Sequence, residues 1–153
     1  MDADSYQACE LCPRRCKARR ASGHAGFCGM TSELRVARSA LHFWEEPPIS
    51  GEAGSGAIFF SGCSLRCVFC QNHEISGEGF GLPVTRSRLS EMMLELEAQG
   101  ALNINLVTAL HYAPDVRQAV LDARAAGLTL PIVCNTSGYE NPEVIRAMAD
   151  VVD

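Results

Sequence analysis

Residues 57–72 read AIFFSGCSLRCVFCQN. The apolar run at the start is bounded by Gly56 and Gly62, which predicts a short buried strand over residues 57–61. Three cysteines follow within eight residues, in the spacing C-x3-C-x2-C: Cys63, Cys67 and Cys70. A strand that leads directly into three thiols indicates a metal-binding or redox loop at the end of that strand.

Three arrangements of these thiols are compatible with the spacing. Positions i, i+4 and i+7 align on a helix, which would give a buried stripe of cysteines, but Ser61 and Gly62 interrupt a helix here. A structural zinc site needs four ligands, and His73 is the nearest candidate for the fourth. A [4Fe–4S] cluster held by only three thiolates has one iron open to another ligand. We favour the cluster because it accounts for the lack of a fourth cysteine close by.

The chain has 153 residues, eight of them cysteine, and a net charge of −5. This charge gives no general reason to expect binding to nucleic acid or to a membrane. No segment approaches the roughly 20 apolar residues that span a bilayer, and the N-terminus is polar and acidic, so we expect a cytoplasmic protein. In a reducing compartment, this many cysteines favour metal or redox chemistry over disulfides.

Residues 1–38 are predicted to form a small segment that is held together by a metal. They carry seven basic and four acidic side chains, a local charge of +3 that leaves −8 for the rest of the chain. A solvated basic face explains the excess, and an anionic partner is the alternative. Either a structural zinc ion or a second iron–sulfur cluster fits the four cysteines of this segment, spaced C-x2-C-x3-C-x11-C: Cys9, Cys12, Cys16 and Cys28.

The rest of the chain divides into a connector and a repeating pattern. Proline and glycine are dense in residues 39–56, which predicts an irregular connector. Residues 57–153 then alternate between short apolar runs and amphipathic stretches with proline at their starts or glycine after their ends. The predicted strands cover residues 57–61, 103–108 and 130–135, and the predicted helices cover residues 86–99, 114–126 and 141–149.

Strand–helix alternation at this spacing predicts an α/β fold with a parallel sheet. Three strand–helix units cannot close a barrel, and residues 151–153 resemble a strand that has barely begun. We therefore expect a chain that is truncated at its C-terminus. Its last strand would be an exposed sheet edge, which predicts low solubility.

The cysteine triplet and its surroundings resemble the radical S-adenosylmethionine superfamily, and within it the proteins similar to pyruvate formate-lyase activating enzyme (the PflX-like group). The resemblance covers nearly the whole chain, and it implies the first half of a partial (β/α)6 TIM-like barrel after a cysteine-rich segment. The stretches that carry it are CELCPRRC (9–16), GFCG (26–29), HFWEEPPISG (42–51), GSGAIFFSGCSLRCVFCQNHEIS (54–76), NINLVTALHY (103–112) and LPIVCNTSGYE (130–140).

The resemblance implies a cluster on Cys63, Cys67 and Cys70 whose open iron binds S-adenosylmethionine. One-electron cleavage would give methionine and a 5′-deoxyadenosyl radical that abstracts hydrogen from a substrate, so the implied enzyme is an oxidoreductase. Phe69 would lie near the adenine. Thr108 stands where relatives have a glycine-rich stretch against the amino group of the cofactor, although this chain lacks those glycines. The implied partners are an electron donor of the flavodoxin or ferredoxin type and a protein substrate.

Polar residues after the predicted strands are further candidates, because α/β proteins bind ligands at this edge. At the end of the third strand, Asn135, Thr136 and Ser137 are either cofactor-pocket residues or strand-end caps. After the second strand, His111 and Tyr112 are either substrate contacts or packing residues. Before the first predicted strand, His42, Glu45 and Glu46 are either acid–base groups or surface residues. Of the remaining candidates, Cys134 is assigned to the core and His24 to the surface. His73 follows the cluster loop and is expected to shield it.

Two hypotheses follow. The first is a radical S-adenosylmethionine enzyme, or the N-terminal part of one, similar to the activases of glycyl-radical enzymes. The second is a non-catalytic zinc-ribbon or iron–sulfur module, or an inactive fragment. They differ in whether S-adenosylmethionine changes the cluster.

Overall fold

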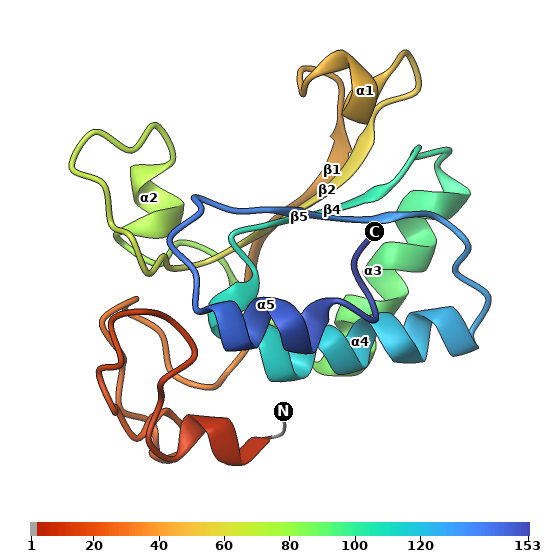
Figure 1. Ribbon diagram of the computed structural model, residues 1–153. Helices are drawn as coiled ribbons and strands as arrows, with labels where there is room; N and C mark the ends of the chain where they lie inside the picture. The colour runs from red at the N-terminus through yellow and green to blue at the C-terminus, as the bar shows by residue number, and fades with distance from the viewer. Residues whose placement is uncertain (1–2) are drawn as a thin grey trace.

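The computed structural model describes residues 3–153, and Figure 1 shows their arrangement. Five strands form one mixed sheet in the order β3-β1-β2-β4-β5. β2, β4 and β5 are parallel, whereas β1 is antiparallel to both β2 and β3. The fold class is therefore α/β, as the sequence pattern predicts. The strands are β1 (Arg35–His42), β2 (Ser55–Phe60), β3 (Leu82–Pro83), β4 (Ile104–Val107) and β5 (Ile132–Asn135).

The three longer helices lie on one side of this sheet (Figure 1). Thr85 caps α3 by accepting a hydrogen bond from the N–H of Arg88, and Asn141 caps α5 by accepting one from Glu143. The predicted helices are confirmed to within one residue at each end. The helices are α1 (Pro47–Ser50), α2 (His73–Ser76), α3 (Arg86–Ala98), α4 (Ala113–Ala125) and α5 (Pro142–Met148), with 3-10 turns η1 (Ala3–Tyr6), η2 (Arg20–Ser22) and η3 (Leu110–Tyr112).

The hydrophobic core lies between the sheet and α3 and α4. Ile58 and Leu106 are opposite each other on β2 and β4, and both are fully buried. Because side chains alternate along a strand, Phe59 and Val107 point to the other face, which the long helices do not cover. Leu89, Met93, Val116 and Val120 complete the core from the helices.

A β-bulge in β1 decides which of its side chains lie on the face without helices, here called the open face. Val36 pairs with Phe60, but Arg38 pairs with Phe59, so Ala37 is an extra residue. Regular pairing would set Arg38 opposite Ile58, on the helix side of the sheet. The bulge instead places Arg38 and His42 on the open face beside Phe59.

The structure corrects two predictions from the sequence. Residues 39–56 are not an irregular connector throughout: β1 continues to His42, and α1 follows. The prolines are tolerated because Pro47 and Pro48 occupy the first positions of α1, where no N–H is needed. The boundary proposed at residue 38 consequently falls inside β1.

Residues 151–153 are not a strand. The N–H of Asp153 donates to the carbonyl of Ile132 at 3.0 Å, and one such bond is too few to form a ladder. The parallel half of the sheet fits the partial barrel, which stays a prediction.

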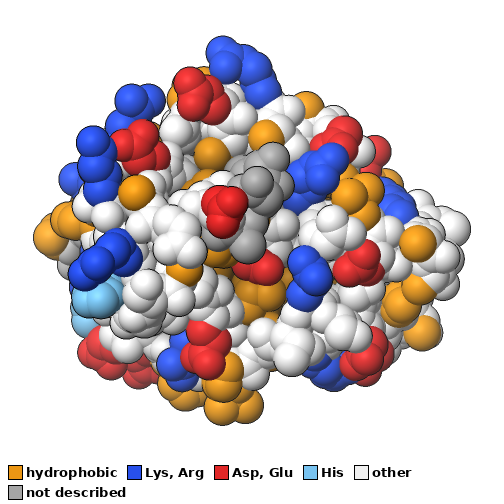
Figure 2. All heavy atoms as spheres, turned by 90° about the horizontal axis from the view of Figure 1, so that it is seen from below, with side chains coloured by type: hydrophobic (Ala, Val, Ile, Leu, Met, Phe, Trp, Pro, Cys, Tyr) orange, Lys and Arg blue, Asp and Glu red, His pale blue; other side chains and the backbone are white. Residues whose placement is uncertain are grey.

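Figure 2 shows the molecule from below, and basic, acidic and apolar side chains are interspersed over that face.

Candidate metal centre

The segment that carries the three cysteines, residues 61–72, is here called the triplet loop. Its first residue, Ser61, is held from three directions. The Ser61 hydroxyl donates to the carbonyl of Phe80 at 2.7 Å, and its N–H donates to the carbonyl of Arg35 at 3.0 Å. Nε2 of His111 donates to the Ser61 carbonyl at 2.9 Å. The loop therefore leaves β2 from a fixed point.

Gly62 turns the chain against the N-terminal segment immediately before the first cysteine of the triplet. Its φ is +81°, a conformation that favours glycine. A Cβ at this position would clash with the side chain of Met30 and would lie 2.8 Å from the carbonyl oxygen of Cys28. Both the backbone conformation and the close packing therefore require glycine here.

All three cysteines of the triplet line one cavity of about 160 Å³, here called the thiol cavity. Each of the three side chains is half-buried. Ser76, in α2, also lines the cavity and donates a hydrogen bond to the sulfur of Cys70 at 3.3 Å. The thiols thus face a single hollow at the carboxyl ends of the parallel strands, where α/β proteins bind ligands.

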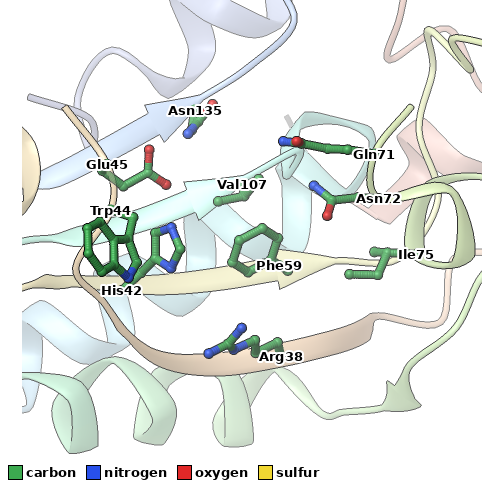
Figure 3. Close-up of a pocket in the computed structure, with 10 residues that line it drawn as sticks. All are labelled: Arg38, His42, Trp44, Glu45, Phe59, Gln71, Asn72, Ile75, Val107 and Asn135. Atoms are coloured by element: carbon green, nitrogen blue, oxygen red, sulfur yellow. The ribbon is translucent and has the colours of Figure 1, made fainter. Parts of the chain in front are cut away.

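A second cavity of about 380 Å³, here called the open-face cavity, adjoins the first. A row of side chains from four neighbouring strands forms its floor: Arg38, Phe59, Val107 and Asn135. Figure 3 shows His42, Trp44 and Glu45 on one side of this row and Gln71, Asn72 and Ile75 on the other. The two cavities share Phe59, Asn72, Ile75 and Val107, so together they form one continuous site.

The open-face cavity holds charged and amide groups. Glu45 accepts a hydrogen bond from Nδ2 of Asn105 at 3.3 Å. Asn105 is fully buried, and its Oδ1 has no hydrogen-bond partner within residues 3–153. The ring of His42 packs edge-on against Phe59. A carboxylate, an imidazole and the guanidinium of Arg38 therefore lie around the apolar side chains of Phe59 and Val107, as in a pocket for a polar organic ligand.

The five predicted cofactor residues do not all reach this site. Thr108 and Ser137 line the thiol cavity, and Asn135 lines the open-face cavity. Thr136 faces the helix side, because neighbouring residues on a strand end point to opposite faces, and it lines an apolar hollow beside α5. Phe69 is 85% exposed and lines neither cavity, so its contact with adenine stays a prediction.

A model of the family described as a 4Fe-4S single cluster domain matches residues 49–153. The chain belongs to this family. The matched residues contain the whole triplet loop, the whole thiol cavity and the parallel part of the sheet. They also contain the open-face cavity except for four of its residues: Arg38, His42, Trp44 and Glu45. The four N-terminal cysteines lie outside them.

This 4Fe-4S single cluster domain is similar over most of its length to an uncharacterized protein of Methanocaldococcus jannaschii. The two are 26% identical over 155 residues, which cover 97% of this chain and 44% of the relative. The chain thus spans less than half the length of that relative. No solved structure matches it. Within residues 3–153, none of the helices combines the length and the apolar character that crossing a membrane requires.

The residues of the 4Fe-4S single cluster domain fit a cluster in their chemistry. Thiolates are the usual ligands of iron–sulfur clusters, and the three cysteines of one loop line the same cavity. No three Cys, His, Asp or Glu side chains among residues 3–153 are arranged to hold a single metal ion as they stand. The shared cavity and the family therefore support these three ligands, and the ligand assignment stays a prediction.

The four N-terminal cysteines are gathered in one small segment. Cys9, Cys12 and Cys28 are buried and Cys16 is exposed. Burial raises the pKa of the Cys12 and Cys28 thiols, although backbone N–H groups and, for Cys28, the charge of Arg20 oppose the rise. The sulfurs of Cys16 and Cys28 would each lie 3.5 Å from a Cβ built on Gly26.

Two of the other candidates are structural. Burial lowers the pKa of His111 to about 3, and the charge of Arg20 lowers it further, so the ring is neutral and donates to Ser61. Tyr112 is fully buried against His111 and Phe60. Both residues pack behind the triplet loop and line neither cavity.

The remaining candidates also lie outside the two cavities. His73 is exposed beside Glu78, and His24 and Glu46 are exposed. Cys134 packs half-buried against the core, where burial raises its pKa to about 11.

Sequence reasoning missed several residues of the site. Gln71 and Asn72 follow Cys70 directly, so their place beside the triplet was a usable signal. Arg38 gave no such signal, because only the bulge at Ala37 turns it to the open face. Arg14 was missed as well. Its guanidinium donates to the carbonyls of Ser64 and Leu65, at 3.1 and 3.3 Å.

Proposed function

We propose that this protein is a radical S-adenosylmethionine enzyme whose [4Fe–4S] cluster is held by Cys63, Cys67 and Cys70. The observation that carries the proposal is the continuity of the thiol cavity with the open-face cavity. A cluster with only three protein ligands has an open iron, and a neighbouring polar cavity gives a second molecule room beside it.

When bound, such a cluster supplies one electron that cleaves S-adenosylmethionine to methionine and a 5′-deoxyadenosyl radical, which abstracts hydrogen from a substrate. The chain's own residues bind and orient the organic ligand. Arg38 and Glu45 offer opposite charges across the open-face cavity, and the amides of Gln71, Asn72 and Asn135 offer hydrogen bonds. Phe59 and Val107 give the floor an apolar surface that favours a base or a side chain over water.

The finer assignment is to enzymes similar to the activases of glycyl-radical enzymes. It rests on the resemblance of the sequence segments described above. Under it, the substrate is a glycine in a partner protein, and the electron comes from a protein of the flavodoxin or ferredoxin type. The parallel strands β2, β4 and β5 would be the first half of a partial (β/α)6 barrel.

The test is EPR of the full chain after anaerobic reconstitution with iron and sulfide and reduction with dithionite. We expect a reduced-cluster signal that shifts when S-adenosylmethionine is added. The shift on adding S-adenosylmethionine should vanish in the triple variant Cys63→Ala, Cys67→Ala, Cys70→Ala and persist in Cys134→Ala, which removes a cysteine outside both cysteine groups. A cluster that S-adenosylmethionine leaves unchanged would favour the non-catalytic module. If the triple variant keeps the shift caused by S-adenosylmethionine, the ligand assignment is wrong.

A further inference from the structure

The N-terminal segment contains a buried cation. The side chain of Arg20 is 1% exposed. Its Nε donates to the carbonyls of Met30 and Thr31, at 3.1 and 3.2 Å, and Nη2 donates to the Thr31 carbonyl at 2.7 Å. Nη1 donates to the carbonyl of His111 at 2.6 Å. Arg20 thereby fixes the N-terminal segment to the rest of the fold.

No carboxylate forms an ion pair with Arg20 within residues 3–153, and its carbonyl partners are neutral. The faces of Tyr6 and Tyr112 lie 4.8 and 5.3 Å from its guanidinium carbon. A guanidinium stays charged in a protein, and burying a charge without an anion is costly. The position therefore calls for a negative charge that ordinary acidic residues do not provide.

Among the groups beside Arg20, the cysteine thiols ionise more readily than the two tyrosine hydroxyls. Nη1 of Arg20 lies 3.5 Å from the sulfur of Cys9. A Cβ built on Gly26 would lie 3.4 Å from Cδ of Arg20 and 3.5 Å from the sulfurs of both Cys16 and Cys28. The glycine thus leaves open a space onto which two sulfurs and the stem of Arg20 converge.

We propose that Cys9, Cys12, Cys16 and Cys28 bind a second metal centre as thiolates, with Arg20 as its buried counter-charge. Four thiolates around a zinc ion or around an oxidised [4Fe–4S] cluster leave a formal charge of about −2, and a buried guanidinium offsets half of that charge. Cys16 is exposed, unlike the other three, and gives the metal a route of entry. This centre shares no residue with the triplet and goes beyond the proposed function.

The first experiment measures metal content after anaerobic purification of the full chain with the triplet removed (Cys63→Ser, Cys67→Ser, Cys70→Ser). We expect about one zinc ion or about four irons per chain, with X-ray absorption showing an all-sulfur shell, at about 2.3 Å for zinc. Zinc and a cluster both support a thiolate centre and are distinguished by the absorption edge. Adding Cys12→Ser should abolish binding, whereas adding Cys134→Ser should not. An absence of metal, or a shell of nitrogen and oxygen, overturns the proposal.

The second experiment tests the role of Arg20 through metal affinity, measured by competition with a chelator. Arg20→Met removes the charge and keeps much of the bulk, and we expect the affinity to fall by at least about tenfold. Arg20→Lys keeps the charge and should lose clearly less. Circular dichroism first shows that both variants are folded. If the two variants lose affinity equally, or neither does, Arg20 is not the counter-charge. The triplet is absent from both experiments, so their failure would leave the proposed function standing.

Discussion

Thr108 has an unusual backbone at the edge of the thiol cavity. Its φ is +58°, a left-handed conformation that β-branched residues rarely adopt. Its N–H continues the pairing of β4 with β5 by donating to the carbonyl of Asn135 at 2.9 Å. The ladder therefore holds this residue in a conformation that its side chain disfavours, at the point where the resembled family has glycines.

We expect Thr108→Gly to raise the free energy of unfolding by about 1 kcal/mol, because glycine adopts a positive φ without the steric cost of a Cβ. Urea unfolding measures the change. Thr108→Ala is the matched control, since it removes the same side-chain atoms beyond Cβ but keeps the left-handed strain. If the glycine variant is no more stable than the alanine variant, the left-handed backbone at Thr108 is not a source of strain.

His111 makes stability depend on pH. Its folded pKa of about 3 lies below the ordinary value of 6.5, because burial and then Arg20 disfavour the charged ring. The unfolded chain therefore binds a proton first, so stability is fully present above about pH 6.5 and is lost as the pH falls toward 3. From pH 6.5 to pH 5 the loss from this one group is about 2 kcal/mol.

The variant His111→Gln isolates this effect. Glutamine keeps a donor for the carbonyl of Ser61 but does not titrate. Urea unfolding at a series of pH values should show a smaller loss of stability on acidification in the variant than in the wild type, by about 2 kcal/mol at pH 5. Parallel curves for the two proteins would mean that another group causes the pH dependence.

At the residue scale, the sequence could indicate which side chains lie close together, but it could not predict the direction in which each one points. The three thiols of the triplet share a cavity, as their spacing indicates. Thr136 and Ser137 are adjacent in sequence, yet the alternation of a strand end sends only Ser137 to the thiol cavity. His111 is polar and follows a strand, but its burial makes it a packing residue.

At the scale of elements, β1 decides the composition of the open-face cavity. The extra residue Ala37 shifts the pairing from Val36–Phe60 to Arg38–Phe59. The sequence carries no periodic signal for this strand, because the bulge breaks its alternation and the following prolines favour a loop. The parallel strands and the helices were predictable, since apolar spacing and flanking proline or glycine mark them locally. The pairing of β1 depends on distant residues.

Deleting Ala37 should remove the bulge and restore regular pairing of β1 with β2. Arg38 would then follow Val36 directly and would still pair with Phe59 on the open face, so we expect the free energy of unfolding to change by no more than about 1 kcal/mol. Ala37→Gly is the control, because it keeps the residue count and costs only about 0.5–1 kcal/mol. A loss of about 3 kcal/mol or more in the deletion variant alone, measured by urea unfolding, would show that the bulge itself stabilises the sheet.

At the scale of the whole molecule, the two cysteine groups lie on separate parts of the chain that contact each other directly. Arg14, between two of the N-terminal cysteines, donates to two carbonyls of the triplet loop, and its guanidinium stacks on Phe27 at 4.1 Å. In the other direction, Arg66 of the triplet loop donates a hydrogen bond to the carbonyl of Phe27, in the N-terminal segment, at 3.2 Å. The N-terminal segment therefore supports the triplet loop, although more than 30 residues separate the two in sequence.

Arg14→Ala should loosen the triplet loop without disturbing the sheet. Hydrogen exchange followed by mass spectrometry should show the amides of residues 61–72 exchanging about three- to tenfold faster, because two charge-assisted hydrogen bonds to the loop are lost and both are partly exposed to solvent. Exchange in α3 should be unchanged, since it packs on the far end of the core. Arg19→Ala is the matched control, as it removes a nearby exposed arginine whose side chain forms no hydrogen bond or ion pair with the loop within residues 3–153. Unchanged exchange in the Arg14 variant, or the same acceleration in both variants, would mean that the loop holds its shape by itself, and that the N-terminal segment packs beside it without supporting it.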